Sequence, residues 1–420
     1  MIVCHGGSNS RVPEIEYSSS MTRKMRSMTN NGAMLPQIGL SAVVDVFDDV
    51  RLFEELDNDR ILQLSRMGGG GGFSSVDNIR RSTGVSVRRL LAQGTSGVDL
   101  AVALCHRLQE VTQISLHEFS AILLCHSHTD ETACSRMAEE LCRRMQLPAG
   151  SIQPVNYGCS GFLKLLHDGA WILDSSPRGS SVALLSVETP EIWHDAADRL
   201  FCGIVSAGAT AAVLQHGGGM PLSVIRSDDF DIPAERRIND GPLFRKDTAD
   251  VVSFHGDSLV RTVMRMNSEP VFLNGIELML NNLRAAMVSI EREPGQRVVV
   301  APHQPSGKLL RALIAAARIE FPDLEFLNNL DRYGNMISSS VPTLLSRLPE
   351  VLQANDLLPL REGDHLILLA AGICMRKIDD HMSGGHACLQ WNTAVSLNRP
   401  EGSAHSVLAP EVSSEYSSSK

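Results

Sequence analysis

Short apolar runs alternate with helical segments along most of this chain, and that alternation constrains the fold more than any other feature. Five runs have the length and the bulky side chains of buried strands, and they lie at 120–127, 182–188, 210–216, 297–303 and 365–372. Helical periodicity separates them, at 97–111, 131–145, 160–173, 272–291 and 306–318. Strands separated by helices predict an α/β fold with a buried, mostly parallel sheet.

The two halves of the chain have the same outline. A tight turn, GCSG, leads from a strand-like run into a helix near Cys159, and YGNMISSSVPTLL does the same near Asn335, 176 residues later. This predicts an internally duplicated fold in which each half offers one helix start to a shared cleft. The predicted division is a loosely ordered lead-in at 1–35, an N-terminal half at 36–216, a C-terminal half at 217–397 and a flexible Ser-rich tail at 398–420.

Composition excludes several classes of protein. The net charge of −10 disfavours nonspecific nucleic-acid binding, and the sequence contains neither a membrane-length apolar stretch nor a secretory signal, so we expect a cytoplasmic location. The nine cysteines are scattered without CxxC or zinc-finger spacing, which argues against disulfides and structural zinc. The MGGGGGFSS run at 67–75 lacks the ending of a phosphate loop, and the HSH triplet at 126–128 lacks a second ligand-bearing element. We therefore expect no cofactor and no metal.

Cys159 differs in its surroundings from the other cysteines. The residues that follow it, Phe162, Leu165, Leu166 and Ala170, lie on one face of a helix. A thiol in the first turn of a helix faces the positive end of the macrodipole and unpaired N–H groups, which favour the nucleophilic thiolate. The flanking glycines permit a sharp turn and the close approach of a substrate. The pattern indicates a nucleophile, although a buried structural cysteine is the commoner reason for a thiol.

Two further polar residues stand where a strand gives way to a helix. His303 ends the apolar run in VVVAPHQPSGKLL, and Asn335 lies in DRYGNMISSS. Strand ends are where open α/β sheets place their active sites. Each residue alone is weak evidence, but together they give the order Cys, His, Asn. Papain-like hydrolases use that order, though with a different cysteine signature; decarboxylative carbon–carbon condensation is the other class that uses it.

The surroundings of these three residues resemble those of the 3-oxoacyl-(acyl-carrier-protein) synthase III family of the thiolase superfamily. The resemblance covers about residues 75–395, and its segments are NYGCSGF, PHQPSGKLL, YGNMISSSVPTLL, RSTGV at 81–85, MNSEPVF at 266–272 and GDHLILLAAG at 363–372. It implies a thiolase-like α/β fold, with two duplicated halves in a layered α-β-α-β-α arrangement, and a homodimer. It also implies an acyltransferase that needs no cofactor.

The resemblance assigns a role to each candidate residue. Cys159 takes an acyl group from a thioester, and His303 and Asn335 hydrogen-bond the thioester carbonyl of a malonyl-type or β-ketoacyl-type donor. That step needs neutral donors, because decarboxylation or deprotonation places negative charge on the enolate oxygen. The backbone N–H groups of Cys159 and Gly372 form the implied oxyanion hole.

Departures from the family suggest a specialised role. Asn78 and Ser82 stand where relatives that load from coenzyme A have Trp and Arg, Ser306 replaces an Asn, VSAGATA at 205–211 lacks an Asp, and 373–391 is a longer C-terminal segment that reshapes the cleft wall. These changes favour substrates carried on an acyl carrier protein, with coenzyme A as the other carrier. An acidic carrier protein would need a basic landing site on this chain. The candidate residues are Arg80, Arg81, Arg88 and Arg89, or Arg261 and Arg265, unless these are ordinary surface charges.

The sequence thus predicts a Claisen-type condensing enzyme of specialised metabolism that joins a Cys-bound acyl group to a second thioester, with or without cyclisation of the product. Two alternatives remain at this point. One is a Cys-His-Asn acyltransferase or thioester hydrolase that forms no carbon–carbon bond. The other is a non-catalytic partner subunit of a ketosynthase.

Overall fold

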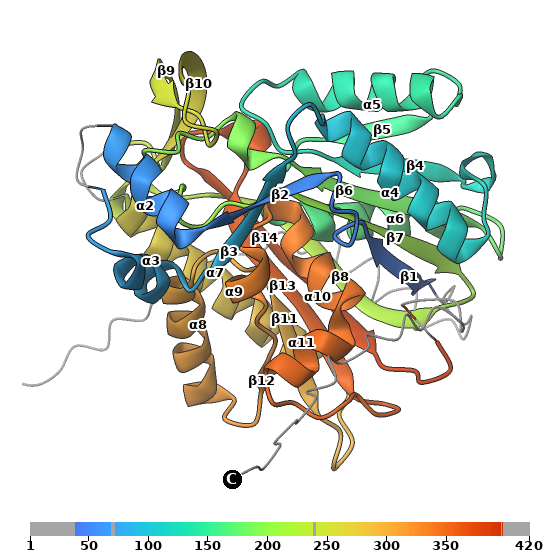
Figure 1. Ribbon diagram of the computed structural model, residues 1–420. Helices are drawn as coiled ribbons and strands as arrows, with labels where there is room; N and C mark the ends of the chain where they lie inside the picture. Colours follow the sequence, from blue (N-terminus) through green and yellow to red (C-terminus); the bar gives the residue numbers. More distant parts are fainter. Residues whose placement is uncertain (1–37, 69–71, 238–240, 396, 398–420) are drawn as a thin grey trace, which may run out of the picture.

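The computed structural model describes residues 38–68, 72–237, 241–395 and 397, so the predicted lead-in and tail lie outside the described residues. Ten strands form one sheet (Figure 1). The N-terminal half contributes β1 (Ile38–Asp45), β4 (Ala121–Cys125), β5 (Ile152–Val155), β6 (Ser181–Glu188) and β7 (Gly208–His216). The C-terminal half contributes β8 (Met220–Asp231), β11 (Val298–Pro302), β12 (Glu325–Phe326), β13 (His365–Ile373) and β14 (His381–Gln390).

The strand order confirms the internal duplication. From the middle of the sheet outward, the first half runs β1-β7-β6-β4-β5 and the second runs β8-β14-β13-β11-β12. Each pair in one half has the same direction as its counterpart in the other. The halves join through a short antiparallel pairing, in which Gly39 faces Pro221 and Leu40 faces Met220. The boundary proposed at 216–217 falls in the connection between β7 and β8.

The expectation of a mostly parallel sheet is wrong. The β6–β4, β4–β5, β13–β11 and β11–β12 pairs are parallel, and the five pairs in the middle are antiparallel. The reason is that β7 and β14 are buried almost throughout. A strand covered on both faces loses the alternation of apolar and polar residues that marks an antiparallel strand in sequence.

Helices pack on the sheet in layers, and all five predicted helices are present. The predicted helix α6 (Gly161–Asp174) and a further helix, α10 (Ser340–Ser346), contact strands of both halves and form the central layer. The outer layers are α4 (Gly97–Thr112) with α5 (Ala133–Arg144) on the N-terminal half, and α7 (Ser268–Ser289) with α8 (Gly307–Glu320) on the C-terminal half. This is the layered α-β-α-β-α arrangement.

The central helix α6 is held by burial of its apolar face. Phe162, Leu165 and Leu166 are at most 2% exposed and pack against strands of the sheet. Each such side chain contributes about 1.5–3 kcal/mol to the free energy of folding. Displacing this helix would lose that free energy, so the helix holds in place the turn that precedes it, which contains Cys159.

The remaining elements lie outside the ten-stranded sheet and the six helices named above. They are β2 (Phe53–Asp57), α2 (Asn58–Met67), α3 (Val76–Thr83), β3 (Val87–Leu91), η2 (Leu116–Glu118), η3 (Pro190–Ile192), η4 (Ala234–Arg236), β9 (Phe244–Val252), β10 (Ser258–Met266), α9 (Leu330–Tyr333), η6 (Ile337–Ser339), α11 (Leu348–Ala354) and η7 (Met375–Lys377). The glycine run at 67–75 connects α2 to α3, and its residues 69–71 are among those not described. No helix in the described ranges has both the length and the apolar character needed to cross a bilayer.

Candidate active site

The Cys159 turn joins β5 to α6 and is shaped by two glycines. Gly158 has φ of 87°, in the left-handed region that favours glycine, and a Cβ there would lie 2.3 Å from the carbonyl oxygen of Ile373. A Cβ on Gly161 would lie 2.4 Å from the Sγ of Cys125. The glycines therefore allow close packing of the turn against the protein itself. The expectation that they serve the approach of a substrate is not what these contacts indicate.

The thiol of Cys159 is not activated in the resting structure. Burial and the nearby charge of Glu188 raise the pKa of this half-buried thiol to about 12, and hydrogen bonds from the backbone of Ile373 and of Cys159 itself only partly oppose them. The predicted stabilisation of the thiolate by the helix N-terminus is thus outweighed. The structure places a neutral thiol at this turn at pH 7.

Gly372 lies directly against Cys159 near the end of β13. A Cβ on Gly372 would be 2.6 Å from the Cβ of Cys159 and 2.8 Å from its Sγ. The amide whose hydrogen bond reaches the sulfur, however, belongs to Ile373, the next residue. The structure therefore points to Ile373 as a donor beside Cys159 that the sequence did not identify, and the oxyanion role of Gly372 stays a prediction.

Replacing Gly372 with alanine should displace Cys159. We expect Gly372→Ala to slow alkylation of the thiol by iodoacetamide at least tenfold and to cost about 1–3 kcal/mol of stability through overpacking. The matched control is Gly275→Ala in α7, where the nearest atom would be at an ordinary 3.6 Å. Alkylation rates and urea unfolding of both variants measure this, and equal behaviour of the two would contradict it.

His303 follows the last residue of β11 and is held there by its backbone. Its N–H donates to the carbonyl of Leu369 on β13 at 2.6 Å. The side chain is 1% exposed, and neither ring nitrogen has a hydrogen-bond partner among the described residues. Burial lowers the pKa of His303 to about 3, so the ring is neutral at pH 7. Leaving a buried polar atom without a partner costs about 1–3 kcal/mol. Unpaired buried nitrogens such as these are typical of groups that bind a ligand.

Asn335 is fixed in a turn after α9. Its N–H donates to the carbonyl of Ile204 at 2.7 Å, and its carbonyl accepts from the N–H of Ser206 at 2.9 Å. The side-chain Oδ1 accepts from the N–H of Ile337 at 2.9 Å, and Nδ2 donates to the carbonyl of Pro305 at 3.3 Å. The amide is therefore oriented with its oxygen satisfied, and its Nδ2 group lies beside the segment that begins at His303.

Backbone strain accompanies this turn. Ile337 has φ of 51°, a left-handed conformation that a β-branched residue rarely adopts. Such outliers persist only where the surrounding structure enforces them, and they cluster at functional sites. The strain lies two residues after Asn335, in the hydrogen-bonded turn that orients the amide.

The structure brings the three predicted residues to one end of the sheet. His303 is bonded to β13 at Leu369, and Cys159 packs against Gly372, further along the same strand. Asn335 is tied to Pro305, two residues after His303. The end of β13 therefore connects the nucleophile turn of one half to the histidine and asparagine segments of the other.

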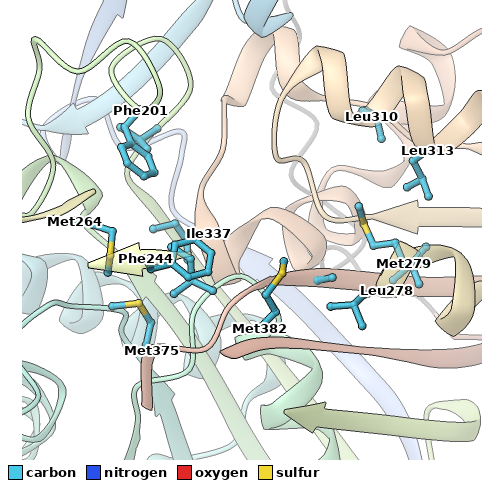
Figure 2. Close-up of a cluster of buried hydrophobic side chains, with 14 of the residues drawn as sticks. Phe201, Phe244, Met264, Leu278, Met279, Leu310, Leu313, Ile337, Met375 and Met382 are labelled. Atoms are coloured by element: carbon cyan, nitrogen blue, oxygen red, sulfur yellow. The ribbon is translucent and has the colours of Figure 1, made fainter. Parts of the chain in front are cut away.

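An apolar cluster rich in methionine lies beside the thiol. Figure 2 shows Phe244, Met264, Ile337, Met375 and Met382 turned toward one another, and Cys159 packs against the cluster to which they belong. Methionine side chains are unbranched and adapt to irregular shapes. The thiol of Cys159 therefore borders a buried, apolar part of the core.

The longer C-terminal segment folds back over the nucleophile turn. Its short helix η7 is tied there by Asp229 of β8, which accepts hydrogen bonds from the hydroxyl of Tyr157 at 2.5 Å and from Arg376 at 2.9 Å. The Arg376 guanidinium lies 5.0 Å from the centre of the Tyr157 ring. The segment thus forms a wall next to Cys159.

Sequence reasoning missed Glu188, Ser127 and Ser338. They form a buried hydrogen-bonded group beneath the Cys159 turn. A charged residue closing the apolar run VALLSVE was the available signal.

In the HSH triplet, the ring of His126 bonds the carbonyl of Val187, and no group of three metal-ligating side chains occurs among the described residues.

Comparisons with known proteins agree with this geometry. Residues 292–375 match the family model described as 3-oxoacyl-[acyl-carrier-protein (ACP)] synthase III C terminal. The β-ketoacyl-[acyl-carrier-protein] synthase III of Synechococcus elongatus is 26% identical over 354 residues, which cover 81% of this chain and 94% of the relative. The chain is thus similar to the 3-oxoacyl-ACP synthase III family over most of its length. It is an enzyme of the acyltransferase class.

Solved structures of synthase III-like proteins show the same fold. The 3-oxoacyl-(acyl carrier protein) synthase III of Pseudomonas aeruginosa superposes with a TM-score of 0.63 at 19% identity, covering 84% of this chain and 98% of that one. A priming β-ketosynthase of a polyketide biosynthetic pathway gives 0.64 at 16% identity, covering 86% and 98%. The predicted thiolase-like fold is confirmed.

The basic residues suggested for carrier docking on this synthase III-like chain are not all available. Arg88 is fully buried, and its guanidinium donates to the carbonyl of Gly203 and to Asn58, so it cannot form a landing site. Arg265 is engaged with Asp195 and Asp198 at about 3 Å. The sequence could not show these contacts, because Arg88 and Arg265 meet partners more than 100 and about 70 residues away, respectively.

Proposed function

We propose that this enzyme condenses a Cys159-bound acyl group with a malonyl- or β-ketoacyl-thioester in a Claisen-type reaction. The observation that carries the proposal is His303, a buried neutral imidazole beside an oriented Asn335 amide; neither of its nitrogens has a partner in the described parts of the chain. Neutral donors are what an enolate oxygen requires. A hydrolase would instead need the imidazole to take a proton from the thiol, which the low pKa of His303 disfavours.

The proposed reaction proceeds in two steps. In the first, the Sγ of Cys159 attacks a thioester carbonyl, and the developing oxyanion is bound by backbone N–H groups while the carrier thiol departs with a proton. In the second, the carbonyl of the donor accepts hydrogen bonds from His303 and Asn335. Loss of carbon dioxide from a malonyl donor, or of a proton to solvent from a β-ketoacyl donor, leaves an enolate whose carbon attacks the acyl group and expels the Cys159 thiolate, which then takes up a proton from solvent.

The experiment that tests the proposal follows both products. The enzyme is incubated with an acyl-carrier protein thioester and a malonyl-carrier protein, and carbon dioxide and the extended product are measured by mass spectrometry. Equal amounts of the two support condensation. Free acid, or transferred acyl groups without carbon dioxide, would instead identify a hydrolase or simple acyltransferase.

We further propose a carrier-protein partner that docks at α3 and the start of α8. Arg80 and Arg81 on α3 and Lys308 and Arg311 on α8 are exposed. The two helices are in contact here, since the Nη2 of Arg311 donates to the carbonyl of Arg81 at 3.0 Å. Because α8 begins four residues after His303, this basic group borders the proposed site and suits an acidic carrier.

Reversing two of these charges should weaken carrier recognition alone. We expect the double variant Arg80→Glu, Arg81→Glu to raise KM for a carrier-bound acyl donor about tenfold through lost electrostatic attraction. The rate with a small N-acetylcysteamine thioester should not change. Arg143→Glu, an exposed arginine on α5, is the control. Equal KM values for the double variant and the control in steady-state kinetics would contradict the proposed docking site.

The departures from the family support a role in specialised metabolism rather than in chain initiation. Asn78 and Ser82 are half-buried on α3 and supply neither a ring nor a cation.

The free edge of β5 is a candidate for a homodimer contact, because an edge strand carries unpaired N–H and C=O groups. The eight described cysteines are free thiols, as expected for a cytoplasmic protein.

A further inference from the structure

A buried carboxyl group with no cation lies beneath the nucleophile turn. Glu188 is the last residue of β6 and is fully buried. Its Oε2 accepts from the N–H of Ser127 at 3.0 Å, and its Oε1 accepts from the hydroxyl of Ser127 at 2.8 Å and from the hydroxyl of Ser338. Among the ion pairs found in the described parts of the chain, none involves Glu188. Three neutral donors satisfy the group instead.

These three donors come from both halves of the fold. Ser127 follows β4 in the N-terminal half, while Ser338 lies in η6 of the C-terminal half, three residues after Asn335. The hydroxyl of neighbouring Ser339 donates to the carbonyl of Ser186 on β6 at 2.8 Å. The end of β6 therefore holds the asparagine turn of one half against the other.

Ser338 also contacts the start of the nucleophile helix. Its Cβ lies 2.8 Å from where a Cβ would stand on Gly161, the first residue of α6 and two residues after Cys159. The charge of Glu188 acts on the thiol of Cys159. The carboxyl group is thus coupled to Cys159 both through packing and through its charge.

We propose that Glu188 is a positioning residue that fixes the Cys159 turn against the Asn335 turn and whose ionisation controls how readily Cys159 loses its proton. The part of this inference that concerns catalysis rests on the proposed function. Burial raises the pKa of Glu188 to about 7, and the bonds from Ser338 and Ser127 oppose that rise. Protonation of Glu188 near neutral pH removes a negative charge that disfavours the thiolate.

Among the described residues, the charge of Glu188 acts on two titratable groups besides Cys159. They are Cys125 at the end of β4 and Cys134 in α5. From β13, Gly372 packs against Cys159 and the backbone of Ile373 donates a hydrogen bond to its sulfur, and neither residue is titratable. A change of charge at residue 188 should therefore be seen directly in the titration of Cys159.

Alkylation of Cys159 tests the effect of this charge without any substrate. The rate of iodoacetamide modification of Cys159 is followed against pH by peptide mass spectrometry in the wild type, Glu188→Gln and Glu191→Gln. Glutamine can still accept from the N–H of Ser127 and can donate to the hydroxyl of Ser338. Removing a unit charge at close range should lower the midpoint in Glu188→Gln by about one pH unit or more.

The control glutamate is closely matched. Glu191 is also buried with a pKa raised to about 7, but its Oε1 accepts from the N–H of Leu91 and its charge is not among those that act on Cys159. Its glutamine variant should keep the wild-type midpoint. Equal midpoints for Glu188→Gln and the wild type, or an equal shift in Glu191→Gln, would overturn the proposed electrostatic role.

Loss of the hydrogen bonds tests the positioning role. Relative to Glu188→Gln, Glu188→Ala should lower kcat for condensation about tenfold with little change in KM, because it removes the acceptor that Ser127 and Ser338 share. Circular dichroism and thermal unfolding confirm that both variants are folded. If Glu188→Ala matches Glu188→Gln in kcat, the positioning role is overturned. Because alkylation requires no condensation, a shifted midpoint in an enzyme without condensing activity would reject only the proposed function.

Discussion

Replacing Cys159 with alanine should abolish formation of an acyl-enzyme. Without the sulfur, no side chain at the turn can accept the acyl group, and we expect condensation to fall by roughly 10³-fold or more, the loss typical of a removed nucleophile. Intact-protein mass spectrometry after incubation with acyl thioesters measures the adduct directly. Because the pKa of Cys159 is raised well above neutrality, its thiolate fraction grows as pH rises. Acylation of the wild type should therefore accelerate as pH rises through neutrality.

A second buried thiol provides the control for this experiment. Cys105 lies in α4, is fully buried, and belongs to a different apolar cluster from the one against which Cys159 packs. Cys105→Ala should retain the adduct, with only a small loss of stability. Decarboxylation of a malonyl donor should persist in Cys159→Ala, because His303 and Asn335 remain. An acyl adduct of undiminished yield in Cys159→Ala would refute the assignment of the nucleophile.

The helices, most of the strands and the duplicated outline could be read from the sequence because they depend on local periodicity. The face of Phe162, Leu165 and Leu166 is buried as the spacing indicated. The direction of the central strands could not be read, since β7 and β14 are buried on both faces and carry no alternation.

The candidate site was predictable in its members and not in its electrostatics. Cys159, His303 and Asn335 stood out because each follows a strand-like run, and the fold brings their segments to the end of β13. The state of the thiol depends on its burial and on the charge of Glu188, and both arise from tertiary packing. Helix position alone suggested a lowered pKa for Cys159, whereas burial, together with a carboxyl group that no spacing reveals, raises it.

Tertiary packing also decides whether a charged residue lies at the surface, which the sequence could not show. Arg88 appeared to belong to a basic surface, yet its side chain is buried and bonded to Asn58 at the start of α2, to the carbonyl of Gly203 and to that of Val85. An arginine in a strand gives no sequence signal of whether its guanidinium faces solvent. The exposed arginines of α3, Arg80 and Arg81, retain the role proposed for carrier docking.

Loss of the neutral donors should separate decarboxylation from acylation. We expect His303→Ala and Asn335→Ala each to reduce malonyl decarboxylation by about 10²–10³-fold, the usual cost of removing one donor to a developing oxyanion. Acylation of Cys159 should remain measurable in both variants by intact mass. Asn335→Asp should lose as much as Asn335→Ala although it is isosteric, because a carboxylate can accept but not donate a hydrogen bond and repels the enolate.

The pH dependence of the same step follows from burial of His303. Because the pKa of His303 is lowered to about 3, the imidazole stays neutral throughout pH 5–9. Ionisation of His303 should therefore add no limb to the pH profile of decarboxylation in Cys159→Ala, whereas a histidine with its ordinary pKa of about 6.5 would add one. His386→Gln, which changes another buried neutral histidine, bonded to Asn282, is the control and should keep the rate. A limb near pH 6.5 that disappears in His303→Gln would show that the imidazole titrates in the working enzyme, and the role of a neutral donor would then be untenable.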